Sequence, residues 1–273
     1  MKTIRRIWHK GIPIELSGEN FNYSDDRKQG PGLDCPKFLP PVEPSIIVCI
    51  HLNYRSRLNE MKRQQPPAPT YFLKPISCLN SHKEPVIRPP SCQFLNYEGE
   101  IALVVGKKTH NISVENASDY IAGYTIANDF GLHDFRETDQ NSMVRVKGFN
   151  SLGVLGPDLA LGWDYRNKMI RTRVNDMIMQ ESNTNEMIWS PEYLLADLSR
   201  SITFNEGDVI LTGTPSNSRP VSPGSIVSVE VEGLGILENP IVEGEYSIEG
   251  KFGAQPMDTP EIRAIALGSD NSK

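Results

Sequence analysis

The chain has 273 residues with a hydrophobic content of 38%, which is enough to bury a large core, as one elaborate domain or as a main domain with a small N-terminal one. Its formal net charge of -6 argues against nucleic acid as a general partner, because there is no basic excess to displace the counterions of phosphate groups. The four cysteines include no Cys-x-x-Cys pair, and no segment resembles a signal peptide or a membrane span, so we expect free thiols, no membrane partner and a cytoplasmic location.

The composition divides the chain into three parts. We expect residues 1–44 to form a small N-terminal segment with a proline-rich linker, since residues 17–44 hold five prolines together with Gly, Asn and Asp, which favour loops. Residues 45–252 carry the strand patterns of a main domain. Residues 253–273 are polar, and we expect a partly disordered tail there.

The main domain begins with the apolar, β-branched run Ser45–Leu52, which predicts a buried strand. A helix is expected over residues 53–62, and another over residues 190–199 with Ser190 as its N-cap and proline in its first turn. Further strands are expected at residues 71–73, 101–105, 120–128, 154–155, 169–174, 209–212, 226–232 and 236–242. This pattern indicates a mixed, β-rich α+β fold with a few helices.

The most informative stretch runs from Asn96 to Gly106, where Glu98 and Glu100 stand one residue apart at the mouth of an apolar run. Alternate residues of a strand point to the same side, so the two carboxylates would project together. Like charges held so close repel each other unless a cation lies between them. A Glu-x-Glu pair is also typical of an exposed strand end, so later features of the chain decide between the two interpretations.

Three later features favour a metal site. A strand ends in Asn128 and Asp129, which can deliver a third carboxylate, and three hard oxygen ligands favour Mg²⁺, Mn²⁺ or Ca²⁺ over Zn²⁺. Lys147 lies between hydrophobic residues, where an ammonium group is costly unless it faces an anion. Thr214 stands in a tight turn after a strand, where a hydroxyl and backbone N–H groups can bind a substrate carboxylate.

In this order the motifs closely resemble the fumarylacetoacetate hydrolase superfamily over about residues 46–242. The motifs that carry the resemblance are Leu52-Asn53-Tyr54, residues 72–75, residues 97–100 with 105–107, residues 121–124 with 128–129, Lys147 with residues 153–157, residues 207–215 and residues 233–239. The resemblance implies a mixed β-roll with a few peripheral helices, a metal-dependent catalytic domain over residues 45–252, and a homodimer.

The resemblance also implies roles for single residues. Glu98, Glu100 and Asp129 would be the ligands of Mg²⁺ or Mn²⁺, with Lys147 beside them as a catalytic residue. Ser151 and Thr214 would bind oxygens of a 2-oxo acid substrate. A cation at such a site stabilises an enolate, and carbon–carbon hydrolysis, decarboxylation and keto–enol isomerisation all pass through an enolate, so the site alone leaves the reaction open.

The helix after Tyr54 departs from the family pattern. Hydrolytic members commonly carry a histidine and a glutamate three residues apart there, whereas this chain has Arg57 before Glu60. Arginine stays protonated and cannot act as a general base, but it can bind a carboxylate bidentately. This favours isomerisation or decarboxylation of a 2-oxo or 2-hydroxydienoic diacid, similar to 2-hydroxyhepta-2,4-diene-1,7-dioate isomerases and related decarboxylases, with Glu60 retained and Arg57 or Arg55 binding the distal carboxylate.

Several alternatives remain open at this point. His51, in the strand before Asn53, or His133, one helical turn after Asp129, can replace the missing base, although a histidine in an apolar strand is more often a core residue. Lys74 is a candidate for substrate binding, or a lysine whose stem covers apolar surface. The rival functions are an acylpyruvate hydrolase, with His51 or a metal-bound water as base, and a non-catalytic homologue that binds a 2-oxo acid.

Overall fold

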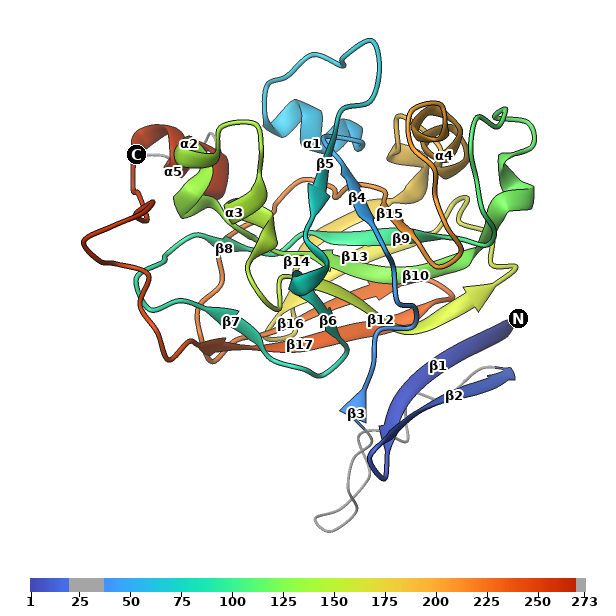
Figure 1. Cartoon of the computed structure of the whole chain (residues 1–273). Coiled ribbons are helices and arrows are strands. Elements are labelled where there is room, and N and C mark those ends of the chain that lie inside the picture. Colours follow the sequence, from blue (N-terminus) through green and yellow to red (C-terminus); the bar gives the residue numbers. More distant parts are fainter. Residues whose placement is uncertain (20–36, 269–273) are drawn as a thin grey trace.

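The computed structural model describes residues 1–19 and 37–268, which form two packed β-sheets with short helices along one side (Figure 1). The expected β-rich α+β fold with a few helices is confirmed. Most of the expected proline-rich linker, residues 20–36, lies outside the described residues, as do residues 269–273. Within the described ranges no helix is long and apolar enough to cross a membrane.

The larger sheet has ten strands within the described residues, eight of them in the order β2-β1-β12-β10-β9-β15-β4-β5, with β3 beside β1 and β6 beside β12. These strands are β1 (Lys2–His9), β2 (Ile12–Glu19), β3 (Lys37–Phe38), β4 (Ile47–Ile50), β5 (Tyr71–Lys74), β6 (Leu79–Ser81), β9 (Gly99–Val105), β10 (Ile121–Asp129), β12 (Gly153–Leu161) and β15 (Val209–Leu211). The sheet is mixed, because β15 pairs with β4 and β12 with β6 in parallel, whereas the other pairs are antiparallel.

The second sheet has five strands among the described residues, in the order β14-β13-β16-β17-β7, and packs against β9, β10 and β12. Its strands are β7 (Val86–Arg88), β13 (Met169–Val174), β14 (Met177–Asn183), β16 (Ile226–Val231) and β17 (Gly235–Glu243). The short strands β8 (Leu95–Asn96) and β11 (Gly131–Leu132) form a separate pair. The helices are α1 (Arg55–Glu60), α2 (Arg136–Asp139), α3 (Val144–Gly148), α4 (Pro191–Ser199) and α5 (Pro260–Leu267), and they lie at the upper side of Figure 1.

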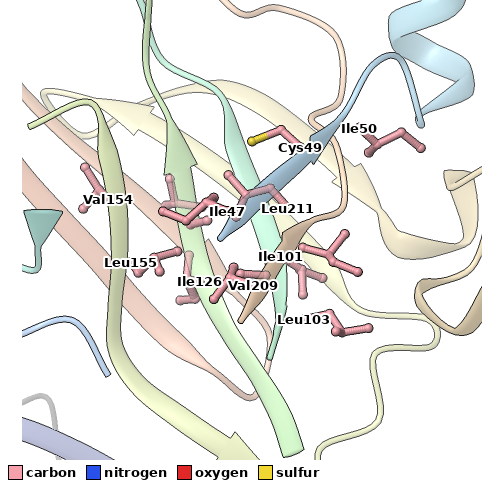
Figure 2. Packing of buried hydrophobic residues seen from close by; sticks show 14 of the residues in the cluster. Ile47, Cys49, Ile50, Ile101, Leu103, Ile126, Val154, Leu155, Val209 and Leu211 are labelled. Carbon is pink, nitrogen blue, oxygen red and sulfur yellow. The ribbon is translucent and has the colours of Figure 1, made fainter. Parts of the chain in front are cut away.

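The core lies between the sheets and around the central strands of the larger one. Every residue of β4, β9 and β15 is buried, and Figure 2 shows side chains of these strands packing together with those of β10 and β12. Strands that are covered on both faces have continuous apolar sequences, and these strands could therefore be predicted from the sequence. The two expected helices are confirmed as α1 and α4, and the Ser190 hydroxyl caps α4 by accepting a hydrogen bond from the Tyr193 N–H at 3.2 Å.

The described N-terminal residues form a hairpin on the edge of the larger sheet. β1 pairs with β2 through a turn at Lys10 and Gly11, which both have positive φ, and with β12 on its other side. The buried Arg5 on β1 donates two hydrogen bonds to Asp158 on β12, at 2.7 and 3.1 Å. The first residues are therefore continuous with the main sheet.

The tail that was expected to be partly disordered contains a helix within its described residues, 253–268. Thr259 caps α5 by accepting a hydrogen bond from the Ile262 N–H, and Pro260 occupies its first turn. Ile262 and Ala266 are fully buried against Phe94. The polar residues on both sides obscured this short apolar run, in which Ile262 and Ala266, four residues apart, are the buried positions.

Stability in acid should depend on His82, which lies between the two sheets. The side chain is 4% exposed, and its Nδ1 accepts a hydrogen bond from the backbone N–H of Glu238 at 3.0 Å. Burial, followed by the positive charges of Lys83 and Arg5, lowers the pKa of His82 from 6.5 to about 3. The neutral ring therefore stabilises the fold above pH 6.5, and this contribution is lost as the pH falls from 6.5 towards 3.

We expect the wild type to lose up to about 1.4 kcal/mol more unfolding free energy per pH unit than His82→Asn between pH 6 and 4. Urea unfolding at a series of pH values measures this slope. His9→Asn, at the exposed end of β1, serves as the control and should keep the wild-type slope. Equal slopes for the wild type and His82→Asn would contradict the assignment.

Candidate metal centre

Three carboxylates meet where β9 and β10 lie side by side. Glu98 directly precedes β9, Glu100 is its second residue and Asp129 ends β10. One oxygen from each lies within 4.8 Å of the others. Antiparallel pairing produces this meeting, because Ala127 stands opposite Glu100 and the Asp129 N–H donates to the Glu98 carbonyl at 2.9 Å. The predicted projection of Glu98 and Glu100 to one side is thus observed, together with a third carboxylate.

Backbone groups fix the orientation of these side chains. Glu100 Oε2 accepts a hydrogen bond from the Gly213 N–H at 2.6 Å. Gly213 has φ +93°, and a Cβ on it would lie 2.8 Å from Cβ of Asn53, so only glycine fits without strain. The Asn53 side chain in turn donates to the carbonyls of Thr212 and Trp189. The turn after β15 therefore holds Glu100 in place.

Two buried lysines bind the same aspartate. Lys147 on α3 donates to Glu98 Oε2 at 2.6 Å, to Asp129 Oδ2 at 2.9 Å and to the Asp129 carbonyl at 2.8 Å. Lys74 at the end of β5 donates to Asp129 Oδ1 at 2.6 Å and to the Phe130 carbonyl at 3.2 Å. The three N–H bonds of Lys147 are all used within the protein, so its ammonium group holds the carboxylates in position.

The electrostatics of the cluster suit a divalent cation. Burial, together with the negative charges of Asp129 and Glu98, raises the pKa of Glu100 well above its usual value. Burial alone would do the same to Asp129, but Lys147 and Lys74 lower its pKa instead. Two lysines leave one of the three negative charges unbalanced, and a cation would remove that cost. Three oxygen donors and no sulfur or nitrogen donor fit Mg²⁺ or Mn²⁺.

A cavity of about 550 Å³ opens above the cluster, and we call it the metal-site cavity. It is lined by Glu98, Glu100 and Lys147, and also by His51, which directly follows β4, by Phe72 on β5 and by Thr214. Further lining residues come from α1, from α2 with the 3-10 turn His133–Phe135, and from Ile265 of α5. This volume accommodates a small organic acid.

The helix α1 brings only one of its expected residues to the cavity. Arg57 lines it but is already paired with Glu60 at 2.6 Å. Glu60 is also bound by Arg219 at 2.6 Å; burial would raise its pKa, yet the two arginines lower it. Glu60 does not line the cavity, and Arg55 donates to the carbonyl of Asn185 on the exposed surface. The expectation that Arg55 meets the substrate is thus not supported by its position.

The two hydroxyls predicted to bind substrate differ in position. Thr214 lines the cavity, and its Oγ1 accepts a hydrogen bond from Gln180 at 3.0 Å, so its own proton remains available to a ligand. Ser151 lies away from the cavity, at φ +72°, and its hydroxyl accepts the N–H of Ile87 on β7 at 2.9 Å. Its predicted contact with substrate oxygens stays a prediction, which the position of Ser151 outside the cavity lining does not support.

Two histidines and one arginine complete the cavity wall. Burial, followed by the charges of Arg136 and Lys147, lowers the pKa of His51 to about 4, so the ring is neutral near pH 7. His133 is 1% exposed, and neither ring nitrogen has a hydrogen-bond partner. Arg136, which the sequence analysis missed, also lines the cavity. Its signal was its position three residues after His133, which places both on one side of a helical turn.

The chain thus combines a strand-rich fold with a buried cluster of three carboxylates beside a cavity. Residues 46–242 match the family model described as fumarylacetoacetate (FAA) hydrolase C-terminal, and the chain belongs to this family. The expected family and its fold are therefore confirmed.

Individual relatives share most of this chain. It is 38% identical over 216 residues to an uncharacterized protein of Archaeoglobus fulgidus, covering 79% of this chain and 86% of that protein. It is 37% identical over 209 residues to the 4-hydroxyphenylacetate degradation bifunctional isomerase/decarboxylase of Escherichia coli, covering 75% of this chain and 48% of that protein. Its fold is similar to that of 2-hydroxyhepta-2,4-diene-1,7-dioate isomerase from Mycobacterium marinum, with a TM-score of 0.79 at 28% identity, covering 90% of this chain and 100% of that one.

Removal of a proposed ligand should weaken metal binding. We expect Glu98→Gln and Glu100→Gln to weaken Mn²⁺ binding by more than about tenfold, because even loss of a residue that only orients a ligand costs about 10- to 100-fold. Electron paramagnetic resonance of free Mn²⁺ measures the affinity. The control is Glu15→Gln, an exposed carboxylate on β2. Wild-type affinity in both ligand variants would refute the site.

Proposed function

We propose that the chain is a Mg²⁺- or Mn²⁺-dependent isomerase or decarboxylase acting on a 2-oxo or 2-hydroxydienoic diacid. The observation that carries this proposal is the cluster of Glu98, Glu100 and Asp129 beside a cavity of about 550 Å³. The names of two relatives support it, one an isomerase/decarboxylase and the other an isomerase. We further propose, from the family resemblance, that the enzyme is a cytoplasmic homodimer.

Each residue of the site has a separate role in this proposal. Glu98, Glu100 and Asp129 would hold the metal, and the bound ion would supply a Lewis acid that accepts the negative charge of an enolate. Lys147 and Lys74 keep Asp129 ionised and fixed in orientation. Thr214 donates its hydroxyl proton to a substrate oxygen. This arrangement binds the 2-oxo acid end of the substrate in one orientation.

The proton transfer needs a group other than Lys147 or Arg57. Lys147 is protonated with its three N–H bonds engaged, and Arg57 is a permanent cation paired with Glu60. His51 is neutral and lines the cavity, and Thr70 lies 3.4 Å from its Nδ1, which leaves Nε2 for the substrate. We assign proton transfer to Nε2 of His51.

One observation favours a second candidate, an acylpyruvate hydrolase. The same neutral His51 can take a proton from water as well as from a substrate carbon, so carbon–carbon hydrolysis remains the rival reaction. A non-catalytic homologue is the third possibility, and it would bind a 2-oxo acid without converting it. The products of the reaction separate all three.

The first test is incubation of the Mn²⁺- or Mg²⁺-loaded protein with a panel of 2-oxo diacids and acylpyruvates, with products identified by mass spectrometry. We expect one of two products, either an isomer of unchanged mass with a shifted double bond or a product that has lost carbon dioxide. In both cases, metal chelation should leave half or less of the activity. Cleavage into two fragments would establish the hydrolase instead. Tight binding of a 2-oxo acid without any product would establish the non-catalytic homologue.

Replacement of His51 tests the assignment of the proton carrier. We expect His51→Gln to lower kcat by about 10²- to 10⁴-fold, the usual contribution of a general acid or base, while Mn²⁺ affinity stays unchanged. The matched control is His110→Gln, because His110 is exposed and does not line the metal-site cavity. An unchanged kcat in His51→Gln would move the proton to another group.

A further inference from the structure

The metal-site cavity is lined by Arg57, Arg63 and Arg136, which differ in what they already bind. Arg57 is already paired with Glu60 at 2.6 Å, a carboxylate that Arg219 also binds. Arg63 is exposed to water. Arg136 is partly buried, and within residues 1–19 and 37–268 its guanidinium has no ion pair or hydrogen bond. A partly buried guanidinium whose donors have no protein partner can bind an anion that enters the cavity.

His133 is a second group that lines the cavity without a hydrogen-bond partner for its side chain in the described part of the chain. It is 1% exposed and lines the cavity, yet neither ring nitrogen has a partner among the described residues. Buried polar groups are normally hydrogen-bonded, so an orphan imidazole facing a cavity points to a ligand. His133 and Arg136 are three residues apart in consecutive helical turns, and so they lie on one side.

The backbone that carries these two residues is held firmly. The Asp134 carboxylate accepts the N–H groups of Gln93 at 2.7 Å and Phe94 at 3.0 Å. The His133 N–H donates to the Phe94 carbonyl, and the Met257 N–H donates to the Asp134 carbonyl, both at 2.9 Å. The segment is fixed from both sides, so His133 and Arg136 are positioned before any ligand arrives.

The charges around the cluster indicate what the ligand is. Lys74 and Lys147 balance two of the three carboxylates, and a divalent cation would leave one positive charge in excess. A single substrate carboxylate at the metal neutralises that charge. A second carboxylate at the far end of the substrate finds no counterion there, and Arg136 is the unpaired, partly buried cation that can supply one.

We propose that His133 and Arg136 form a subsite that binds the distal carboxylate of a 2-oxo dicarboxylate. This proposal rests on the proposed function, which places the 2-oxo acid end at Glu98, Glu100 and Asp129. It reassigns the role that the sequence suggested for Arg55 or Arg57, since the first lies outside the cavity and the second already has a partner. Arg136 binds the carboxylate bidentately and His133 donates one N–H to it.

The experiment measures binding rather than turnover. The Mn²⁺-loaded full chain is titrated by calorimetry with 2-oxoadipate and with 2-oxohexanoate, which has the same length but a methyl group in place of the distal carboxylate. We expect Arg136→Gln to weaken 2-oxoadipate by at least about tenfold, as expected for loss of charged hydrogen bonds, and to change 2-oxohexanoate by less than about twofold. His133→Asn should show the same selectivity with a smaller loss.

Two controls separate a specific contact from a change in charge. Arg63→Gln removes the same charge from an exposed part of the same cavity and should leave the preference for 2-oxoadipate unchanged. Arg136→Lys keeps the charge but loses the planar fork, so it should recover only part of the affinity. Circular dichroism checks that each variant is folded.

The outcomes are distinct. Equal weakening of both ligands in Arg136→Gln, or no weakening of either, would overturn the subsite while leaving the metal site intact. A wild-type protein that binds Mn²⁺ but neither 2-oxo acid would overturn the proposed function, and the subsite would fall with it. Selective loss of 2-oxoadipate affinity in Arg136→Gln and His133→Asn would establish the subsite.

Discussion

The binding of Asp129 by two lysines is the interaction on which the rest of the site depends. Three buried carboxylates would repel one another, and Lys74 and Lys147 reach them from β5 and α3 while Asp129 ends β10. Removal of one partner from a buried ion pair costs about 3–5 kcal/mol, because the other charge is left uncompensated. The network therefore joins two strands and a helix that are far apart in the sequence, and the geometry of the cluster and the stability of this part of the fold have the same origin.

Much of the fold could be predicted because its central strands are buried on both faces and appear as apolar runs. The edges could not be predicted in the same way. The strand β1 buries Arg5, whose burial depends on Asp158, a residue 153 positions later in the chain. No local pattern reports such a pair. The helix α5 buries Ile262 and Ala266 against Phe94 in a distant loop, and the Asn96 side chain donates to the Ala266 carbonyl at 2.9 Å. Elements that are stabilised by contacts with distant residues are hard to predict from their own local sequence.

The candidate site shows the same division. Glu98, Glu100 and Asp129 could be predicted to meet, because strand periodicity and a metal's need for several oxygens act on the same residues. The expected contact of Ser151 with substrate stays a prediction, since its hydroxyl binds the backbone N–H of Ile87 and does not line the cavity. Arg136 was missed because an unpaired guanidinium is visible only once its surroundings are known. Sequence thus indicates where charges gather, and the structure shows which of them are already satisfied.

Helix α5 lies outside the region of the chain that matches the family, yet it reaches the cavity. The match to the family ends at residue 242, before this helix begins. Ile265 nevertheless lines the cavity, and the Met257 N–H holds the segment that carries His133. One wall of the cavity is therefore shaped by residues outside the matched region. A change in the C-terminal segment can therefore alter the shape of the cavity without any change at Glu98, Glu100 or Asp129.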